Sequence, residues 1–302
     1  MYYFLYGTLY LISLLPFFIL YRLSDLAFFV LFYISGYRKK IVYDNLNIAF
    51  PEKSSEEKKK IAKQFYRNLT DTFIETLKLL SMSETSFSKR ASINFSAAQS
   101  LVDKGFNIQF HSGHQMNWEY ASLAISRALT IPWLAVYTHI ESKPVERLFL
   151  RIRSRFGAIM VEKDKYRVMM PLLMRKQYAL GLIADQNPSA ASRAYWLNFF
   201  NKPAPFLIGP EKGAMRHKTA VVCVNIIKLK RGYYHFDCIP VTEDGSKSVS
   251  GELTRQYRDF LEAGIRKNPD NYLWSHRRWK WDWDQEYDRK WVDTVARPKM
   301  WQ

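Results

Sequence analysis

The sequence predicts an α/β protein with a mixed, largely parallel central sheet flanked by helices, preceded by an N-terminal transmembrane helix. Short β-rich runs alternate with helical patterns from residue 91 onward, and this alternation is typical of βαβ units. Two further strand-like runs, 219–230 and 233–240, are joined by only two residues, which predicts a hairpin and therefore one antiparallel pair. The first 21 residues carry no charged side chain, which predicts the membrane helix.

The N-terminal run, residues 1–21, is long enough as a helix to cross a hydrocarbon core of about 30 Å. It lacks the basic start and the small-residue cleavage site of a signal peptide, so we expect an uncleaved anchor. A second apolar run, 26–37, is too short to cross and is expected at the membrane interface or packed on the domain. Three basic residues follow at 38–40. By the positive-inside rule we expect a single-pass protein with a membrane segment in 1–40 and one cytoplasmic domain in 41–302.

The first helix expected in the cytoplasmic domain covers residues 54–80. Ser54 and Glu57 form a capping-box pattern at its start. Apolar side chains then recur every four residues, as expected for the buried stripe of an amphipathic helix. These are Ile61, Phe65, Leu69, Phe73 and Leu77.

Four strands and three helices are expected in the βαβ region that follows. The strands are predicted in 106–110, 132–137, 157–162 and 178–185, and the helices in 117–129, 143–156 and 164–177. His111 and His114 come directly after the first strand, and Asp185 ends the fourth. Because the carboxyl ends of parallel strands meet at one edge, where ligands bind, we expect these side chains at the same edge.

The composition favours an anionic partner and a reducing compartment. The chain has 45 Lys and Arg against 28 Asp and Glu, a net charge of +17, which favours nucleic acid, anionic lipid or an acidic protein. With a membrane anchor present, an anionic membrane surface is the simpler explanation, and we expect no nucleic acid. The two cysteines, Cys223 and Cys238, lie in strand-like runs, where we expect small buried hydrophobes rather than a disulfide or a zinc site.

His114 and Glu119 are the sequence's strongest indication of catalysis. Residues five apart do not share one face of a continuous helix, so we expect His114 in the loop before the helix and Glu119 about one turn inside it. A carboxylate there can accept the proton of one imidazole nitrogen and leave the other as a general base. Without a nucleophilic Ser or Cys of its own, this base would act on a substrate hydroxyl.

Two other interpretations of this motif remain open. A metal site would use His111, His114 and Glu119, but the spacing differs from H-E-x-x-H and the next histidine is His139. A structural pair would have His114 hydrogen-bonded in the core and Glu119 solvated. The position of the motif between a strand and a helix favours catalysis, and we expect no metal and no cofactor.

The block "FHSGHQMNWEY" (110–120) resembles the H-F-G-N-W-E block of the late acyltransferases of lipid A biosynthesis, the lauroyl/myristoyl family of the lysophospholipid acyltransferase superfamily. Gln115 and Met116 replace the usual Phe-Gly, and Asn201 stands where the family often has Gly. The resemblance extends in order through further blocks: 43–66, "RIRSRFGAIMVEK" (151–163), "LIADQNP" (182–188), "FFNKPAPF" (199–206) and "NPDNYLWSHRRWK" (268–280). It implies a fold like that of the glycerolipid acyltransferases.

The resemblance also implies which residues form the site. The catalytic dyad would be His114 and Glu119. The substrate-binding residues would be Asn117, Arg153, Arg155 and Asp185. Arg153 would contact an anionic group of the substrate, although its basic helix would also suit a purely solvated arginine.

The function implied is transfer of a fatty acyl chain from an acyl thioester to a hydroxyl of a lipid A precursor in lipopolysaccharide biosynthesis. The partners would be a membrane lipid acceptor, acyl carrier protein or acyl-CoA as donor, and the anionic surface of the inner membrane. One alternative is acylation of another lipid, such as a lysophospholipid, a phosphoinositide mannoside or an aminolipid. Another is a non-catalytic, membrane-tethered protein that binds anions.

Two aromatic segments near the C-terminus have both a structural and a functional interpretation. Segment 195–206 is either a surface loop packed by its own aromatic rings or the wall of an acyl-chain groove. Segment 275–284 combines basic residues with tryptophans, which suit either membrane headgroups or a packed C-terminal helix.

Overall fold

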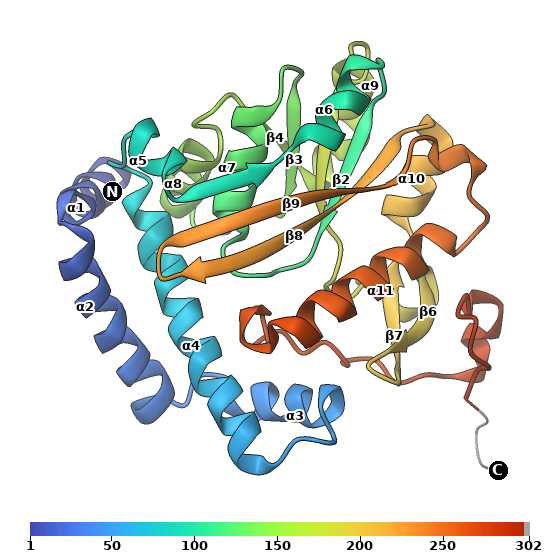
Figure 1. Cartoon of the computed structure of the whole chain (residues 1–302), viewed down its shortest axis with the longest axis horizontal. Helices are drawn as coiled ribbons and strands as arrows, with labels where there is room; N and C mark the ends of the chain where they lie inside the picture. The colour runs from blue at the N-terminus through green and yellow to red at the C-terminus, as the bar shows by residue number, and fades with distance from the viewer. Residues whose placement is uncertain (299–302) are drawn as a thin grey trace.

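A seven-stranded sheet lies between helices in the computed structural model, which describes residues 1–298 (Figure 1). Its strand order is β1-β9-β8-β2-β5-β3-β4, and β6 and β7 form a separate two-stranded sheet. The strands are β1 Ala91–Asn94, β2 Ile108–Ser112, β3 Trp133–Tyr137, β4 Ile159–Glu162, β5 Ala179–Ile183, β6 Ala194–Phe199, β7 Lys202–Leu207, β8 Ala220–Lys230 and β9 Tyr233–Thr242. All four strands predicted in the βαβ region are present.

The large sheet is mixed and mostly parallel, as predicted. Every neighbouring pair runs parallel except β8 and β9, which form the predicted hairpin. Gly232 in its turn has φ +77°, and a Cβ there would collide with the hydroxyl of Tyr21. The turn therefore needs glycine both for its conformation and for its close approach to the N-terminal helices.

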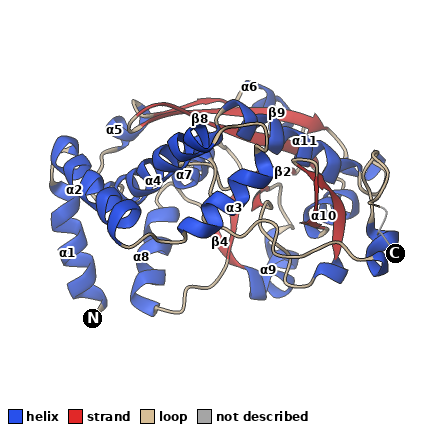
Figure 2. Cartoon of the chain, turned by 90° about the horizontal axis from the view of Figure 1, so that it is seen from below, coloured by secondary structure: helices blue, strands red, loops and turns tan. Residues whose placement is uncertain are grey.

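The helices pack on both faces of this sheet (Figure 2). The α-helices are α1 Tyr2–Leu14, α2 Phe17–Phe29, α3 Lys39–Ala49, α4 Ser55–Lys78, α5 Glu84–Ser88, α6 Ser96–Asp103, α7 Trp118–Ala128, α8 Lys143–Arg153, α9 Tyr166–Leu173, α10 Gly209–His217 and α11 Glu252–Lys267. The π-helix η1 is Val30–Ile34, and the 3₁₀ turns are η2 Lys163–Lys165, η3 Ala191–Arg193, η4 Gly245–Lys247, η5 Pro269–Asn271 and η6 Gln285–Lys290.

The N-terminal apolar region differs from the prediction of one membrane helix over residues 1–21. Helix α1 ends at Leu14 and α2 begins at Phe17, because Pro16 has no N–H for the helix and its ring clashes with the preceding turn. Helix α2 then continues into η1, so the second apolar run is part of one longer helix. The segment long and apolar enough to cross a membrane is Phe17–Ile34. The division into a segment 1–40 and a domain 41–302 stays a prediction, and residues 299–302 lie outside the described part.

Helix α4 confirms the predicted capping box and most of the predicted stripe. The backbone N–H of Ser54 donates to the Glu57 carboxylate at 2.8 Å, and the Ser54 hydroxyl accepts from the Glu57 N–H. Phe65 and Leu69 are buried in the core, but Phe73 is 56% exposed. Residues spaced by four drift around the helix axis, because 3.6 residues per turn do not match a strict repeat of four. The buried face of the helix therefore does not include Phe73.

Alternate side chains of β2 separate the two faces of the sheet. Phe110 stacks on Phe95 and meets Trp133 edge-on, in the core cluster that includes Ile125 of α7. His111 points the other way, toward Tyr257 of α11. Helix α7 thus covers one face near the end of β2, while α10 and α11 cover the other.

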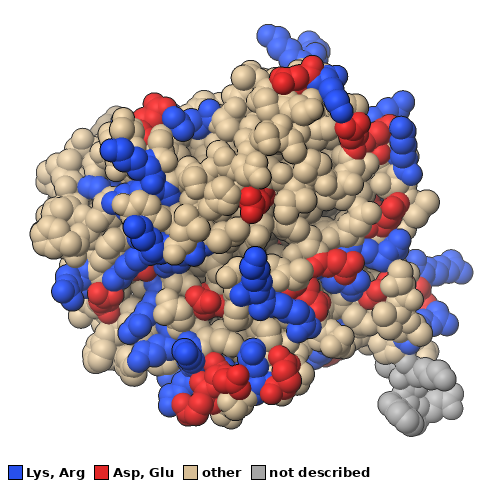
Figure 3. All heavy atoms as spheres, in the orientation of Figure 1, with Lys and Arg blue, Asp and Glu red and all other residues tan. Residues whose placement is uncertain are grey.

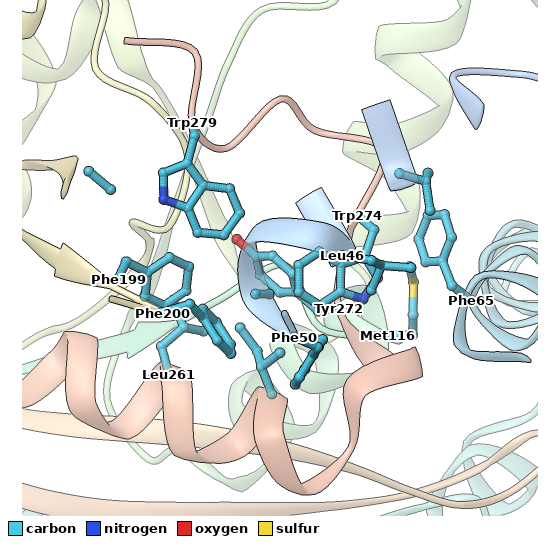
Figure 4. Packing of buried hydrophobic residues seen from close by; sticks show 14 of the residues in the cluster. Leu46, Phe50, Phe65, Met116, Phe199, Phe200, Leu261, Tyr272, Trp274 and Trp279 are labelled. Atoms are coloured by element: carbon cyan, nitrogen blue, oxygen red, sulfur yellow. The ribbon is translucent and has the colours of Figure 1, made fainter. Parts of the chain in front are cut away.

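The aromatic segment 195–206 is a β-hairpin in the core and not a surface loop. Phe199 and Phe200 pack against Trp279, and Figure 4 shows these rings with residues from α3, α4 and α11. Trp274 is fully buried and Trp279 is 8% exposed, so neither reaches membrane headgroups. Between α11 and residue 298 the chain contains 3₁₀ turns rather than the packed helix that was the alternative.

Gly181, in the middle of β5, generates a prediction about this fold. A Cβ at this position would lie 2.5 Å from the ring of Trp133, and that ring is held by a hydrogen bond to Ser122. We expect Gly181→Ala to destabilise the protein by about 1–3 kcal/mol because of overpacking. Gly209→Ala is the matched control, since a Cβ there meets no atom within 4 Å. Equal thermal unfolding midpoints for the two variants in detergent would contradict the prediction.

Candidate active site

The candidate site lies where β2 and β5 end side by side. The two strands run parallel, with Ser112 paired to Ile183. His114 and Asp185 each follow two residues after their strand, so the shared register brings them together. The prediction that His114 and Asp185 lie at one edge of the sheet is confirmed, whereas His111, expected directly after the strand, lies inside β2.

Asp185 holds both the backbone and the ring of His114. Its Oδ2 accepts the His114 backbone N–H at 3.0 Å, and its Oδ1 lies 2.6 Å from Nδ1. The carboxylate is 2% exposed and the imidazole 19%. With Nδ1–H donating to Asp185, Nε2 is left as the acceptor nitrogen, 3.4 Å from the side-chain amide of Gln186.

The electrostatics of this pair favour charge on both partners. Burial opposes protonation of His114, but the charge and hydrogen bond of Asp185 outweigh it, so the pKa of His114 is raised above its ordinary value. Burial also opposes ionisation of Asp185, but the charge and hydrogen bonds of His114, with the charge of Arg278, lower the pKa of Asp185. The site can thus hold an imidazolium beside a carboxylate.

Glu119 is the second residue of α7, within its first turn rather than one turn inside as predicted, and its carboxylate binds Arg153 and not His114. Arg153 donates from Nε to Oε2 at 3.0 Å and from Nη2 to Oε1 at 2.5 Å. This difference has a physical reason, because Glu119 is buried and a buried carboxylate is best satisfied by a bidentate guanidinium. The Trp118 ring meets His114 edge-on at 5.4 Å, and the charge of Glu119 still contributes to the raised pKa of His114.

Two predicted substrate-binding residues have structural contacts instead. Asn117 is fully buried; it caps α7 by accepting the Tyr120 N–H, and its amide donates to Glu75 at 3.1 Å. Arg155 donates to the backbone carbonyls of residues 79 and 82 at the end of α4. These contacts include neither His114 nor Asp185, and a substrate-binding role for Asn117 and Arg155 stays a prediction.

The three residues of the metal alternative do not converge. His111 lies 3.0 Å from the side chain of Gln109, and burial lowers its pKa to about 4. It is therefore a neutral core histidine, while His114 binds Asp185 and Glu119 binds Arg153.

A buried network behind the catalytic loop was not found from the sequence. Glu75 of α4 accepts hydrogen bonds from Asn117 and from the hydroxyl of Tyr234, at 3.1 and 2.7 Å. Burial raises the pKa of Glu75. The sequence did contain a signal for this network, because Asn68, Asp71 and Glu75 are spaced to lie on one face of the helix, beside its apolar stripe.

A second feature missed from the sequence is Arg278, which is 1% exposed. Its guanidinium donates to the carbonyl of Pro205 at 3.0 Å and lies over the ring of Phe206. Its charge acts on Asp185, so a buried cation stands behind the carboxylate that holds His114.

Known proteins are similar to this chain over most of its length. A family model described as bacterial lipid A biosynthesis acyltransferase matches residues 1–281. The lipid A biosynthesis palmitoleoyltransferase of Escherichia coli (strain K12) is 22% identical over 248 residues, covering 80% of this chain and 79% of that protein. The lipid A biosynthesis acyltransferase of Shigella flexneri matches with the same identity and coverage.

Glu75 provides a prediction about the support of the catalytic loop. Glu75→Ala leaves the buried amide of Asn117 and the hydroxyl of Tyr234 without their acceptor, so we expect a loss of roughly 1–3 kcal/mol of stability. Asp44→Ala is the control, because it removes only an exposed ion pair with Lys40 and should change stability by less than about 1 kcal/mol. Thermal unfolding of the detergent-solubilised protein measures both. A Glu75→Ala midpoint equal to that of Asp44→Ala would show that the network is not stabilising.

Proposed function

The chain belongs to the bacterial lipid A biosynthesis acyltransferase family, and we propose that it transfers a fatty acyl chain from an acyl thioester to a hydroxyl of a lipid A precursor. The observation that carries the proposal is the hydrogen bond between His114 and Asp185 at the carboxyl edge of the sheet. It leaves one imidazole nitrogen as acceptor in a partly open position, which is what a base acting on a substrate hydroxyl requires.

His114 is the catalytic base in this mechanism. Its Nε2 takes the proton of the acceptor hydroxyl while the hydroxyl oxygen attacks the thioester carbonyl. The new C–O ester bond forms, the C–S bond breaks, and the imidazolium returns its proton to the leaving thiolate. Asp185 is a positioning residue, because it fixes the tautomer of His114 and stabilises the imidazolium without touching the substrate.

The pair of Glu119 and Arg153 has a different role from the one expected of Glu119 alone. Arg153 donates hydrogen bonds to Glu119 from Nε and Nη2, while its Nη1 has no hydrogen-bond partner among residues 1–298. The side chain is 21% exposed. We assign Nη1 to an anionic group of the substrate and Glu119 to holding the guanidinium in place.

The net charge of +17 suits the partners of this reaction. A phosphorylated acceptor, an anionic membrane surface and an acidic donor, either acyl carrier protein or acyl-CoA, are all attracted to a basic protein. We assign the enzyme to the inner membrane with its catalytic domain on the cytoplasmic side. The single-pass topology expected from the sequence is one form of this attachment.

The experiment that tests the function combines an assay with lipid analysis. Purified protein in mixed micelles is given an acyl thioester and either a lipid A precursor or a lysophospholipid, and lipid A from cells lacking or overproducing the protein is measured by mass spectrometry. We expect acylation of the lipid A precursor and a matching mass change in cells. Transfer to the lysophospholipid alone would contradict the acceptor assigned here.

The next prediction separates the roles of Asp185 and Glu119. His114→Ala should lose about 10²–10⁴-fold in turnover, the usual contribution of a general base. Asp185→Asn should lose a similar factor, and the double variant should be little worse, because residues acting as one unit are not additive. Glu119→Gln combined with His114→Ala should show a further loss. Near-normal turnover in His114→Ala, or additive losses for His114 and Asp185, would contradict the mechanism.

The pair of His114 and Asp185 also leads to a prediction about how kcat/KM depends on pH. The base must be neutral to act, so kcat/KM falls at acidic pH as His114 is protonated. Asp185 raises the pKa of His114, so Asp185→Asn should move this acidic limb to lower pH while lowering the plateau. The pH profile of kcat/KM measures the shift, and a limb that stays in place would show that another group titrates.

Arg153 provides a prediction about substrate binding. Arg153→Lys keeps the charge but cannot bind Glu119 through two nitrogens while reaching the substrate with a third. We expect an increase in KM of roughly tenfold or more, since hydrogen bonds between charged groups contribute about 1.5–3 kcal/mol. Arg127→Lys, in an exposed ion pair with Glu84, is the control. Equal kinetics in the two variants would show that Arg153 only pairs with Glu119 and does not bind the substrate.

A further inference from the structure

The segments that flank the apolar helix Phe17–Ile34 on its two sides are both bound to the same helix of the catalytic domain. Lys78, at the end of α4, donates to the carbonyl oxygens of Ser13 and Leu15 at 2.7 and 3.0 Å. Tyr66, earlier in α4, donates to the carbonyl of Tyr37 at 2.5 Å. A helix that crosses a membrane has its two ends on opposite sides, so crossing here would require α4 to cross as well.

Helix α4 is unsuited to the interior of a bilayer. It carries charged residues throughout its length, and α2 contacts it through polar groups. Ser24 donates to Asp71 at 2.7 Å, and Arg231 of the β8–β9 turn binds both Asp71 and Asp25, at 2.6 and 2.7 Å. Asp25 is near the middle of Phe17–Ile34, about 12 Å along the axis from either end. Crossing would therefore put this charged cluster at the bilayer centre, where charged side chains are most unfavourable.

A charged cleft beside the helix also argues against a helix that crosses the membrane. It has a volume of about 970 Å³ and lies between α2, α4 and the β8–β9 turn. Phe28, Phe29 and Tyr33 form its apolar wall. Its basic residues are Lys63, Arg67, Lys228, Lys230 and Arg231, and its acidic residues are Asp25, Asp71 and Asp270. A cleft of this size lined by charged side chains belongs at the depth of water and headgroups and not in hydrocarbon.

The opposite side of α1, α2 and η1 is apolar and uncovered. Only 22% of the Phe17–Ile34 window is buried. The large exposed side chains here include Tyr3, Phe4, Leu11, Leu14, Phe18, Leu26 and Ile34. In Figure 3 uncharged atoms form the outer edge of the molecule at α1, and basic side chains border them. An exposed apolar surface of this extent marks an interaction site.

Basic residues next to this surface favour an anionic membrane as the partner. Helix α1 packs on α8, where Arg147 lies over the ring of Tyr2 and Arg151 over that of Tyr6. Lys39 and Lys40 follow η1 at the other end. Cations around an apolar helix face are typical of helices that lie in the membrane interface.

We propose that α1, α2 and η1 lie in the plane of the cytoplasmic leaflet of an anionic membrane, with their exposed apolar face inserted, and do not cross the bilayer. The helices then sit about 5–10 Å into the headgroup region, and the cleft opens at headgroup depth. The inference concerns attachment and does not rest on the identity of the acyl acceptor.

Depth measurement on the full-length protein distinguishes this arrangement from a crossing helix. Phe18, Leu26 and Ile34 are exposed and follow one another at intervals of eight residues, or about 12 Å. Each is replaced singly by cysteine and spin-labelled in vesicles of phosphatidylethanolamine and phosphatidylglycerol. Val168→Cys on α9, also exposed, is the matched control. Collision with oxygen and with a water-soluble nickel complex gives the depth of each label.

We expect the three labels at similar, shallow depths and the control label in water. A label at Leu26 that lies about 12 Å deeper than both others would establish a crossing helix and overturn the proposal. Water exposure of all three labels would show that a protein partner or a second copy covers this face, and would also overturn it.

Topology in cells provides an independent test. A cysteine-bearing tag is fused before Met1, and Val249→Cys, an exposed position of the domain, serves as the control. With a membrane-impermeant maleimide we expect neither site to react in intact spheroplasts and both to react after the membrane is opened. Labelling of the N-terminal tag in intact spheroplasts would overturn the in-plane arrangement, whatever the outcome of the acylation assay.

Discussion

The need to pair every buried carboxylate is the constraint on which this structure depends. An ionised carboxylate removed from water is tolerated only when a cation or several donors satisfy it. Asp185 is paired with His114, Glu119 with Arg153, and Asp71 with Arg231. Each pair joins two elements that are distant in sequence, so the same bonds that satisfy the charges also fix the geometry of the site.

Helix α4 connects the N-terminal apolar helices with the loop that carries His114. Asp71 binds α2 and the β8–β9 turn, and one helical turn later Glu75 binds Asn117 at the start of α7. Asn117 caps the helix that carries Glu119. The position of the apolar helices relative to the site is therefore determined by a single rigid element, which fits an enzyme whose acceptor lies in the membrane.

The departure of Glu119 from its expected role shows how far local spacing can be used. The spacing from His114 to Glu119 correctly predicts a loop followed by the first turn of a helix. It does not reveal which side chains other elements bring to that turn. Arg153 at the end of α8 and Asp185 after β5 both lie close to the motif. Each group of the motif pairs with the partner that suits it better: the Glu119 carboxylate binds the Arg153 guanidinium, and the His114 imidazole binds the Asp185 carboxylate.

The sequence by itself determined the parts of this protein that depend on local periodicity and on charge. The capping box and most of the stripe of α4, the alternation that gives a mostly parallel sheet, the β8–β9 hairpin and the placement of His114 and Asp185 at the same edge of the sheet all follow from patterns within a few residues or from a rule of parallel sheets. The tertiary structure alone decided three things. Strand order made Asp185 the partner of His114, contacts to α4 decided how the apolar helices pack on the domain, and the packing of segment 195–206 against Trp279 made a core hairpin of an apparent loop. Each depends on contacts between residues that are distant in the sequence, and no local pattern encodes such a contact because many different partners satisfy the same local rule.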